Sequence, residues 1–179
     1  GKYHDIEEED EVSAFLEYPN GAVGHFITTT AETPGTNRLE IAAERGRLVL
    51  EDGKLRYTRN EVPTMEWLRT TDERFGRPPV WHVDVPAPGK NESHAGIMRN
   101  FRDAILEGTP LIARAEEGIH SVELANAMLL SGLKQAPVSL PLDGDEFEGR
   151  LQELIESSTF QKKAVEEGGP ADLAGSFNA

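Results

Sequence analysis

Residues 11–43 read EVSAFLEYPNGAVGHFITTTAETPGTNRLEIAA, and this stretch determines the fold class that we expect. From Val12 to Tyr18 every second residue is apolar, which is the period of a half-buried β-strand. Pro19-Asn20-Gly21 follows, and because Asn and Gly tolerate a positive φ it predicts a hairpin turn. Residues 22–31, rich in threonine, then read as a second strand. The opening of the chain therefore predicts an antiparallel sheet.

Three more strands are expected after this hairpin. Residues 32–36 contain Pro and Gly, which interrupt pairing and predict a loop, and residues 37–43 read as the third strand. The short runs 47–51 and 54–59 flank Asp52-Gly53, a two-residue signal for a tight hairpin. Five strands in sequence predict a meander.

The segment 60–92 has no single period. Five prolines interrupt it, and only residues 81–85 read as one more strand. We therefore expect a mixed segment here, between the strands and the helical part of the chain.

Three helices are expected in the second half of the chain. The first begins near Ser93, a predicted N-cap, and stops at Gly108. The second covers about 116–134, where a wide apolar face predicts packing on the sheet. The third follows acidic residues at 143–146, which favour the positive end of a helix. The apolar residues that define these faces are Ile97, Phe101, Ala104 and Ile105, then Ile119, Val122, Ala125, Met128, Leu129 and Leu133, then Phe147, Leu151, Leu154 and Ile155.

These elements predict an α+β fold, an open antiparallel sheet covered on one face by helices. The length of 179 residues suits one well-buried core, so we expect one domain over residues 1–160. Residues 161–179 are expected to form a flexible tail.

Composition excludes several classes of function. A net charge of −14, with 18 basic residues among 32 acidic ones, disfavours nucleic acid as a partner. No apolar run approaches the roughly 20 residues that span a bilayer, so we expect no membrane partner. The absence of cysteine excludes disulfides and thiolate chemistry and fits the cytoplasm. The five histidines show no paired spacing of metal ligands, so no metal is expected.

Several segments together resemble a known family. They are residues 20–41, 46–50 and 94–101, Glu117-Gly118 before the long helix, and Ser131 near its end. In order and spacing they resemble the C-terminal domain of the Gfo/Idh/MocA family, named for glucose-fructose oxidoreductase, inositol dehydrogenase and rhizopine catabolism. The resemblance covers roughly residues 9–156.

The resemblance implies both a fold and an activity. The fold would be like the C-terminal domain of dihydrodipicolinate reductase, with an N-terminal Rossmann domain as its partner in a parent enzyme. That enzyme would move hydride between NAD or NADP and a sugar, inositol or related polyol. The family's Glu-Lys-Pro and Asp-x-x-x-His patterns do not occur here, and Gly21-Ala22-Val23-Gly24 lies in a hairpin rather than a phosphate loop. We therefore expect no catalytic or cofactor-binding residues in this chain, which should be inactive alone.

Four residues are candidates for contacts to the substrate. His94 stands at the start of a helix, where free N–H groups favour oxygen-rich ligands. Glu32, Asn37 and Arg38 are expected near the rim of the same cleft. Two simpler interpretations stay open: His94 beside Ser93 serves only the helix start, and Arg38 forms a surface pair with Glu40.

The expected sheet also predicts a role in assembly. Its uncovered face, with side chains from strands 22–31 and 37–43, is too apolar for water, and the family resemblance implies a symmetric homo-oligomer through it. The alternative to an enzyme domain is a non-catalytic interaction module that uses the same face.

Overall fold

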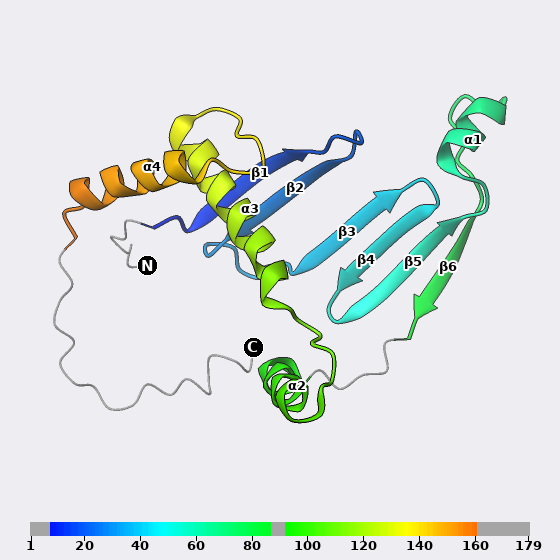
Figure 1. Ribbon diagram of the computed structural model, residues 1–179. Coiled ribbons are helices and arrows are strands. Elements are labelled where there is room, and N and C mark those ends of the chain that lie inside the picture. The colour runs from blue at the N-terminus through cyan, green and yellow to red at the C-terminus, as the bar shows by residue number, and fades with distance from the viewer. Residues whose placement is uncertain (1–7, 87–91, 161–179) are drawn as a thin grey trace. The chain divides into compact units, whose positions relative to one another are not determined.

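The structure is a computed structural model that describes residues 8–86 and 92–160 of the chain (Figure 1). Its backbone forms two compact units, Gly1–Thr30 with Arg114–Ala179, and Ala31–Ala113. Within the described residues there are six strands and four helices, and both sheets are antiparallel and open. The prediction of an α+β fold is therefore confirmed.

The first unit contains a two-stranded sheet. Strands β1 (Glu11–Glu17) and β2 (Val23–Thr29) pair in register from Glu11 opposite Thr29 to Glu17 opposite Val23. The predicted turn joins them: Gly21 has a φ of 83°, and the side chain of Asn20 accepts a hydrogen bond of 3.0 Å from the N–H of Ala22. The hairpin forms because its turn residues supply the φ that the strand pairing requires.

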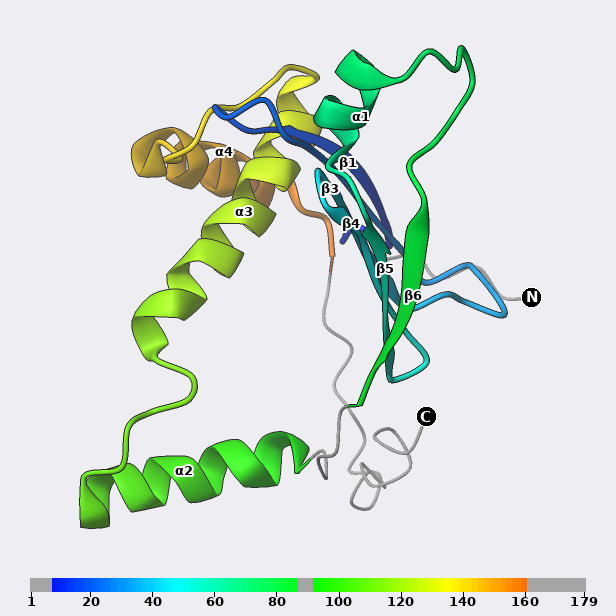
Figure 2. The same cartoon turned by 90° about the vertical axis from the view of Figure 1, so that its right-hand side faces the viewer.

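Two helices belong to the same unit, α3 (Ala115–Lys134) and α4 (Gly144–Ser157). In the view that shows the sheet edge-on, both lie on the same side of β1 and β2 (Figure 2). Leu130 on α3 is 1% exposed and Ala127 is 7% exposed, so the core of this unit sits at the C-terminal half of α3. Ile119 and Val122, in its N-terminal half, are 65% and 59% exposed, so the predicted wide apolar face is covered over only part of its length.

The second unit contains a four-stranded sheet in the order β3-β4-β5-β6. Its strands are β3 (Arg38–Ala43), β4 (Gly46–Glu51), β5 (Lys54–Asn60) and β6 (Val80–Val85). Asp52 and Gly53, with φ of 51° and 68°, make the predicted β4–β5 hairpin. Strand β6 confirms the strand expected at 81–85.

The expected five-stranded meander is divided into two sheets, because β2 and β3 do not pair. The loop between them contains Thr33-Pro34-Gly35, and a connection of this length and composition does not impose a hairpin register in the way that Asn-Gly or Asp-Gly does. The sequence located the loop, but not its effect on pairing.

The two faces of the β3–β6 sheet differ in chemistry. Because side chains alternate along a strand, the pairing register places one apolar set on one face. It comprises Leu39, Ile41, Leu48, Leu50, Leu55, Tyr57, Trp81, Val83 and Val85. The opposite face carries mainly charged side chains, among them Arg38, Glu40, Arg47, Glu51, Arg56 and Asp84. We call these the apolar face and the charged face.

A short helix, α1 (Thr64–Thr70), lies in the segment that the sequence left as mixed. It is held at its start by Glu44 in the β3–β4 turn. The carbonyl of Glu44 accepts from the N–H of Thr64 at 2.9 Å, and its carboxylate accepts from the N–H of Met65 at 3.0 Å. A helix of seven residues whose start is fixed by a contact twenty residues away has no periodic signal of its own.

Helix α2 (Ser93–Glu107) ends at Gly108, as predicted, where φ is 71°. Its N-cap is Glu92 rather than Ser93, which is the first helical residue and has a φ of 48°. Three of the four apolar residues that define its stripe are exposed, Ile97 at 43%, Phe101 at 53% and Ile105 at 68%, whereas Ala104 is half-buried. Among the helices of the described residues, none is both long and apolar enough to cross a bilayer.

Candidate functional site

A solvent-open hollow lies along α2 and the loop that follows it. The lining residues are Glu92, Ser93, His94, Gly96, Ile97, Arg99, Asn100, Asp103 and Ile112. Most of them carry hydrogen-bonding groups, and both signs of charge are present. Because the lining contains both hydrogen-bond donors and acceptors, it can bind a polar ligand.

His94 lies in the first turn of α2 and lines this hollow. The carboxylate of Glu92, just before the helix, forms an ion pair with the guanidinium of Arg99 one turn beyond His94. Gly96 leaves room for this arrangement, since a Cβ at this position would come within 2.9 Å of the Cβ of Glu92. The charges on either side of His94 are therefore already paired with each other.

Asn100 connects the helix to the loop after it. Its amide nitrogen donates to the carbonyl of Pro110 at 3.0 Å, and its amide oxygen accepts from the N–H of Ile112 at 3.0 Å. Both the donor and the acceptor of the Asn100 amide are thus hydrogen-bonded to the backbone of the loop. Sequence reasoning did not single out Asn100, although a mid-helix asparagine followed by a Gly-Thr-Pro loop is a weak signal for such a contact.

Arg38 lies at the start of β3 on the charged face of the sheet. Its guanidinium pairs with the carboxylate of Glu40 and, at 3.2 Å, with that of Glu51. Glu51 also pairs with Arg56 at 2.8 Å. The hydrogen bond from Arg38 holds the pKa of the Glu40 carboxyl below its ordinary value, and the same bond raises the pKa of Arg38. The Arg38–Glu40 surface pair, one of the two simpler interpretations, is present.

The other two predicted rim residues lie beside β3 rather than in it. Glu32 is in the loop between β2 and β3, and Asn37 directly precedes β3, so the third strand begins one residue later than expected. The lining of the hollow, as described, comes from residues 92–112 and includes His94 but not Glu32, Asn37 or Arg38. A shared site for the four residues stays a prediction.

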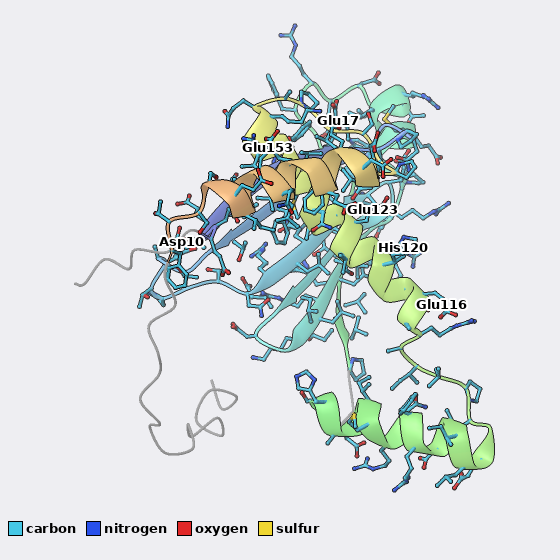
Figure 3. All side chains as sticks on the ribbon, turned by 60° about the vertical axis from the view of Figure 1, so that its left-hand side comes forward. Asp10, Glu17, Glu116, His120, Glu123 and Glu153 are labelled. Atoms are coloured by element: carbon cyan, nitrogen blue, oxygen red, sulfur yellow. The ribbon has the colours of Figure 1, made fainter. Side chains whose placement is uncertain are left out.

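Acidic side chains line another helix, α3. Glu116, His120 and Glu123 come from this one helix at intervals of four and three residues (Figure 3). Glu123 accepts a hydrogen bond of 2.9 Å from the N–H of Leu142, and the pKa of Glu116 is lowered by its own backbone N–H and by Arg114. Within residues 8–86 and 92–160 there is no group of three His, Cys, Asp or Glu side chains that could hold a metal ion. The contacts of Glu116 therefore lie at the start of α3, and the contact of Glu123 lies at the α3–α4 connection.

Comparison with known proteins agrees with the architecture. The family model described as the C-terminal alpha/beta domain of the Gfo/Idh/MocA oxidoreductase family matches residues 2–140. No curated protein gives a significant match to the chain. The match spans both sheets, α2 and the whole of α3, which is far more than half of the 179 residues. The chain therefore belongs to the Gfo/Idh/MocA oxidoreductase family, as its C-terminal α/β domain.

Proposed function

We propose that this domain forms the substrate side of an NAD- or NADP-dependent oxidoreductase that acts on a sugar, inositol or related polyol. The observation that supports this most directly is the polar hollow along α2, with His94 on its wall. The partner would be the N-terminal Rossmann domain of the parent enzyme, which would bring the nicotinamide to the substrate carbon. A chain without cysteine fits the reducing cytoplasm, where we place that enzyme.

In this proposal His94 contacts the substrate, with Glu32, Asn37 and Arg38 at the rim. The imidazole can donate and accept, as recognition of a hydroxyl group requires. Arg38 already has two carboxylate partners, so it would contact a ligand through its remaining N–H groups. The four residues are therefore not equivalent, and His94 is the first to test.

The test is His94→Ala in the parent enzyme, assayed with NAD and NADP against inositols and common aldoses. We expect kcat/KM for the best polyol to fall by at least tenfold, about 1.4 kcal/mol of transition-state stabilisation. His120→Ala, which removes an exposed histidine from α3, is the matched control and should leave kcat/KM unchanged. An unchanged kcat/KM in His94→Ala would remove this residue from the site.

The 179-residue chain alone should bind neither NAD nor NADP and oxidise no sugar. A pocket wall without a cofactor cradle and a proton-transfer residue lacks the positioning that hydride transfer requires. Calorimetric titration with both cofactors and an absorbance assay for the reduced nicotinamide test this. Micromolar cofactor binding, or any turnover, would contradict it.

A second role, assembly, is favoured by a different observation. Each unit has exposed apolar side chains on its sheet: Ile27 on β2 of the first unit is 71% exposed, and Leu39 and Ile41 on β3 of the second unit are 57% and 51% exposed. We propose that exposed sheet side chains of this kind form a symmetric contact between two copies, burying on the order of 1,000 Å² or more. The alternative, a non-catalytic module, would use the same surface for another protein.

The face used can be identified by paired substitutions on one strand. Leu39→Glu places a charge on the apolar face, and Ala42→Glu places the same charge on the charged face. If the apolar face forms the contact, light scattering at micromolar concentration should show that only Leu39→Glu dissociates the oligomer. Dissociation by Ala42→Glu alone would assign the contact to the charged face, and a monomeric unsubstituted protein would remove the assembly proposal.

A further inference from the structure

The loop after α2 is attached to the helix by one side chain. Asn100 hydrogen-bonds to Pro110 and Ile112 at 3.0 Å each, and these residues are ten and twelve positions further along the chain. Gly108 reverses the chain at the helix end with a φ of 71°. The amide of Asn100 therefore fixes the distance between the returning loop and the middle of α2.

The covered face of α2 agrees with this attachment. Gly96, Asn100, Asp103 and Ala104 are half-buried, whereas the other three residues of the apolar stripe, Ile97, Phe101 and Ile105, are exposed. The half-buried positions follow one another at intervals of four, three and one, so they share one helix face. Asn100, the residue to which the loop is attached, lies on this half-buried face.

The attached loop contributes an apolar wall to the hollow. Ile112 lines the hollow and is the residue whose N–H Asn100 holds, while His94, Arg99 and Asp103 supply polar groups from the helix. Ile112 is also 68% exposed, so its side chain is available to a ligand. A sugar ring has hydroxyl groups at its edge and C–H groups on its faces, and it can use both kinds of wall.

We propose that Asn100 is a positioning residue for substrate specificity: it holds Ile112 in place opposite the polar wall that contains His94. This rests on the proposed function of the hollow. Without the two hydrogen bonds the loop would move relative to α2, and the apolar wall would no longer be fixed. Binding, rather than the chemical step, would then weaken.

The first measurement is hydrogen exchange in the parent enzyme, which needs no substrate. In Asn100→Ala the amide of Ile112 should exchange faster by roughly fivefold, the equivalent of about one net hydrogen bond. In Asn100→Asp, which keeps an acceptor for that N–H, exchange should stay closer to the unsubstituted protein. Asn20→Ala removes a comparable amide-to-backbone bond in the β1–β2 turn and should leave Ile112 unaffected. Unchanged exchange in Asn100→Ala would overturn the proposal.

The second measurement is steady-state kinetics with myo-inositol and D-glucose and each nicotinamide cofactor. Asn100→Ala should raise KM several-fold with little change in kcat, and Ile112→Ala should do the same without altering exchange in the rest of the loop. Faster exchange with unchanged KM in both variants would overturn the positioning role. If the unsubstituted enzyme turns over neither compound, the proposed substrate class fails, and the exchange data alone support or overturn the attachment of the loop by Asn100.

Discussion

Both units contain strands in which apolar residues alternate with polar or small ones, but these apolar residues are buried to different extents in the two units. In the first unit, where α3 and α4 lie beside the sheet, the alternate residues Val12, Ala14 and Leu16 of β1 are half-buried. In the second, every residue of β3 is exposed, although Leu39 and Ile41 alternate with charged or small residues in the same way. The alternation therefore predicts which side chains share a face, while burial depends on whether another element covers that face.

The units also differ in charge. The first unit contains 6 basic and 19 acidic side chains, and the second contains 12 basic and 13 acidic side chains. The ion-pair network of Arg38, Glu40, Arg47, Glu51 and Arg56 belongs to the balanced unit. Nearly all of the chain's excess negative charge thus lies in the first unit, so the proposed contact between copies would meet less electrostatic repulsion if it formed through the second unit.

Both tryptophans, Trp67 and Trp81, belong to the second unit, so their fluorescence reports its unfolding separately. Far-UV circular dichroism also reports α3 and α4 of the first unit. The two signals let a substitution be assigned to one unit, and together they show whether the two units differ in stability.

The largest loss of unfolding free energy is expected from Gly46→Ala in the second unit. Gly46 has a φ of 133°, and a Cβ there would lie 2.0 Å from the carbonyl oxygen of Thr58 on β5. A clash with backbone and the strained φ together should cost about 4 kcal/mol of unfolding free energy. Chemical denaturation followed by tryptophan fluorescence measures it.

Gly21→Ala is the matched control in the first unit. Gly21 has a φ of 83°, but a Cβ there meets no atom within 4 Å. Only the strain of the backbone remains, so a loss of about 1 kcal/mol is expected. Equal losses in the two variants would show that the close approach of β4 and β5 at Gly46 is not a constraint.

The next largest loss of unfolding free energy is expected in the first unit, from Leu130→Ala. Leu130 is 1% exposed, and its truncation should cost about 2 to 3 kcal/mol through lost burial and the cavity left behind. The helical dichroism should shift more than the tryptophan fluorescence. Leu106→Ala, at a side chain 72% exposed on α2, should change the stability by less than about 0.5 kcal/mol. A fluorescence shift as large as the dichroism shift would mean that the units unfold together.

The sequence predicted best those features that depend on residues close together in the chain. Both hairpin turns, the end of α2 at Gly108 and the acidic start of α4 were found, because their signals lie within four residues. What it missed depends on distant partners. Helix α1 needs Glu44, the loop after α2 needs Asn100, and neither contact leaves a periodic pattern. His94 could be placed on the helix that lines the hollow, but no local signal relates Glu32 or Asn37 to that helix.

Helix α4 offers a smaller test of the same contrast. Asp143 caps it by accepting hydrogen bonds from the N–H groups of Asp145 and Glu146 at 3.0 and 3.1 Å. Asp143→Ala should lower stability by about 1 kcal/mol, and Asp143→Asn, which keeps an acceptor, should restore most of it. The measurement is the helical dichroism during denaturation. Equal losses in both variants would show that the charge at this helix end, and not the hydrogen bonds, is what stabilises it.

The smallest effect concerns the charged face of the second unit. The pKa of Glu40 is lowered in the folded protein, chiefly by the hydrogen bond from Arg38, so folding favours the ionised carboxylate. Its contribution is complete above the unfolded pKa of about 4.3 and is lost as the pH falls through the lower folded value. Glu40→Gln should therefore flatten the loss of stability on acidification below about pH 4.3. Because the pair is exposed, added salt should reduce the difference between the two proteins, and a difference that persists in molar salt would contradict an origin in this ion pair.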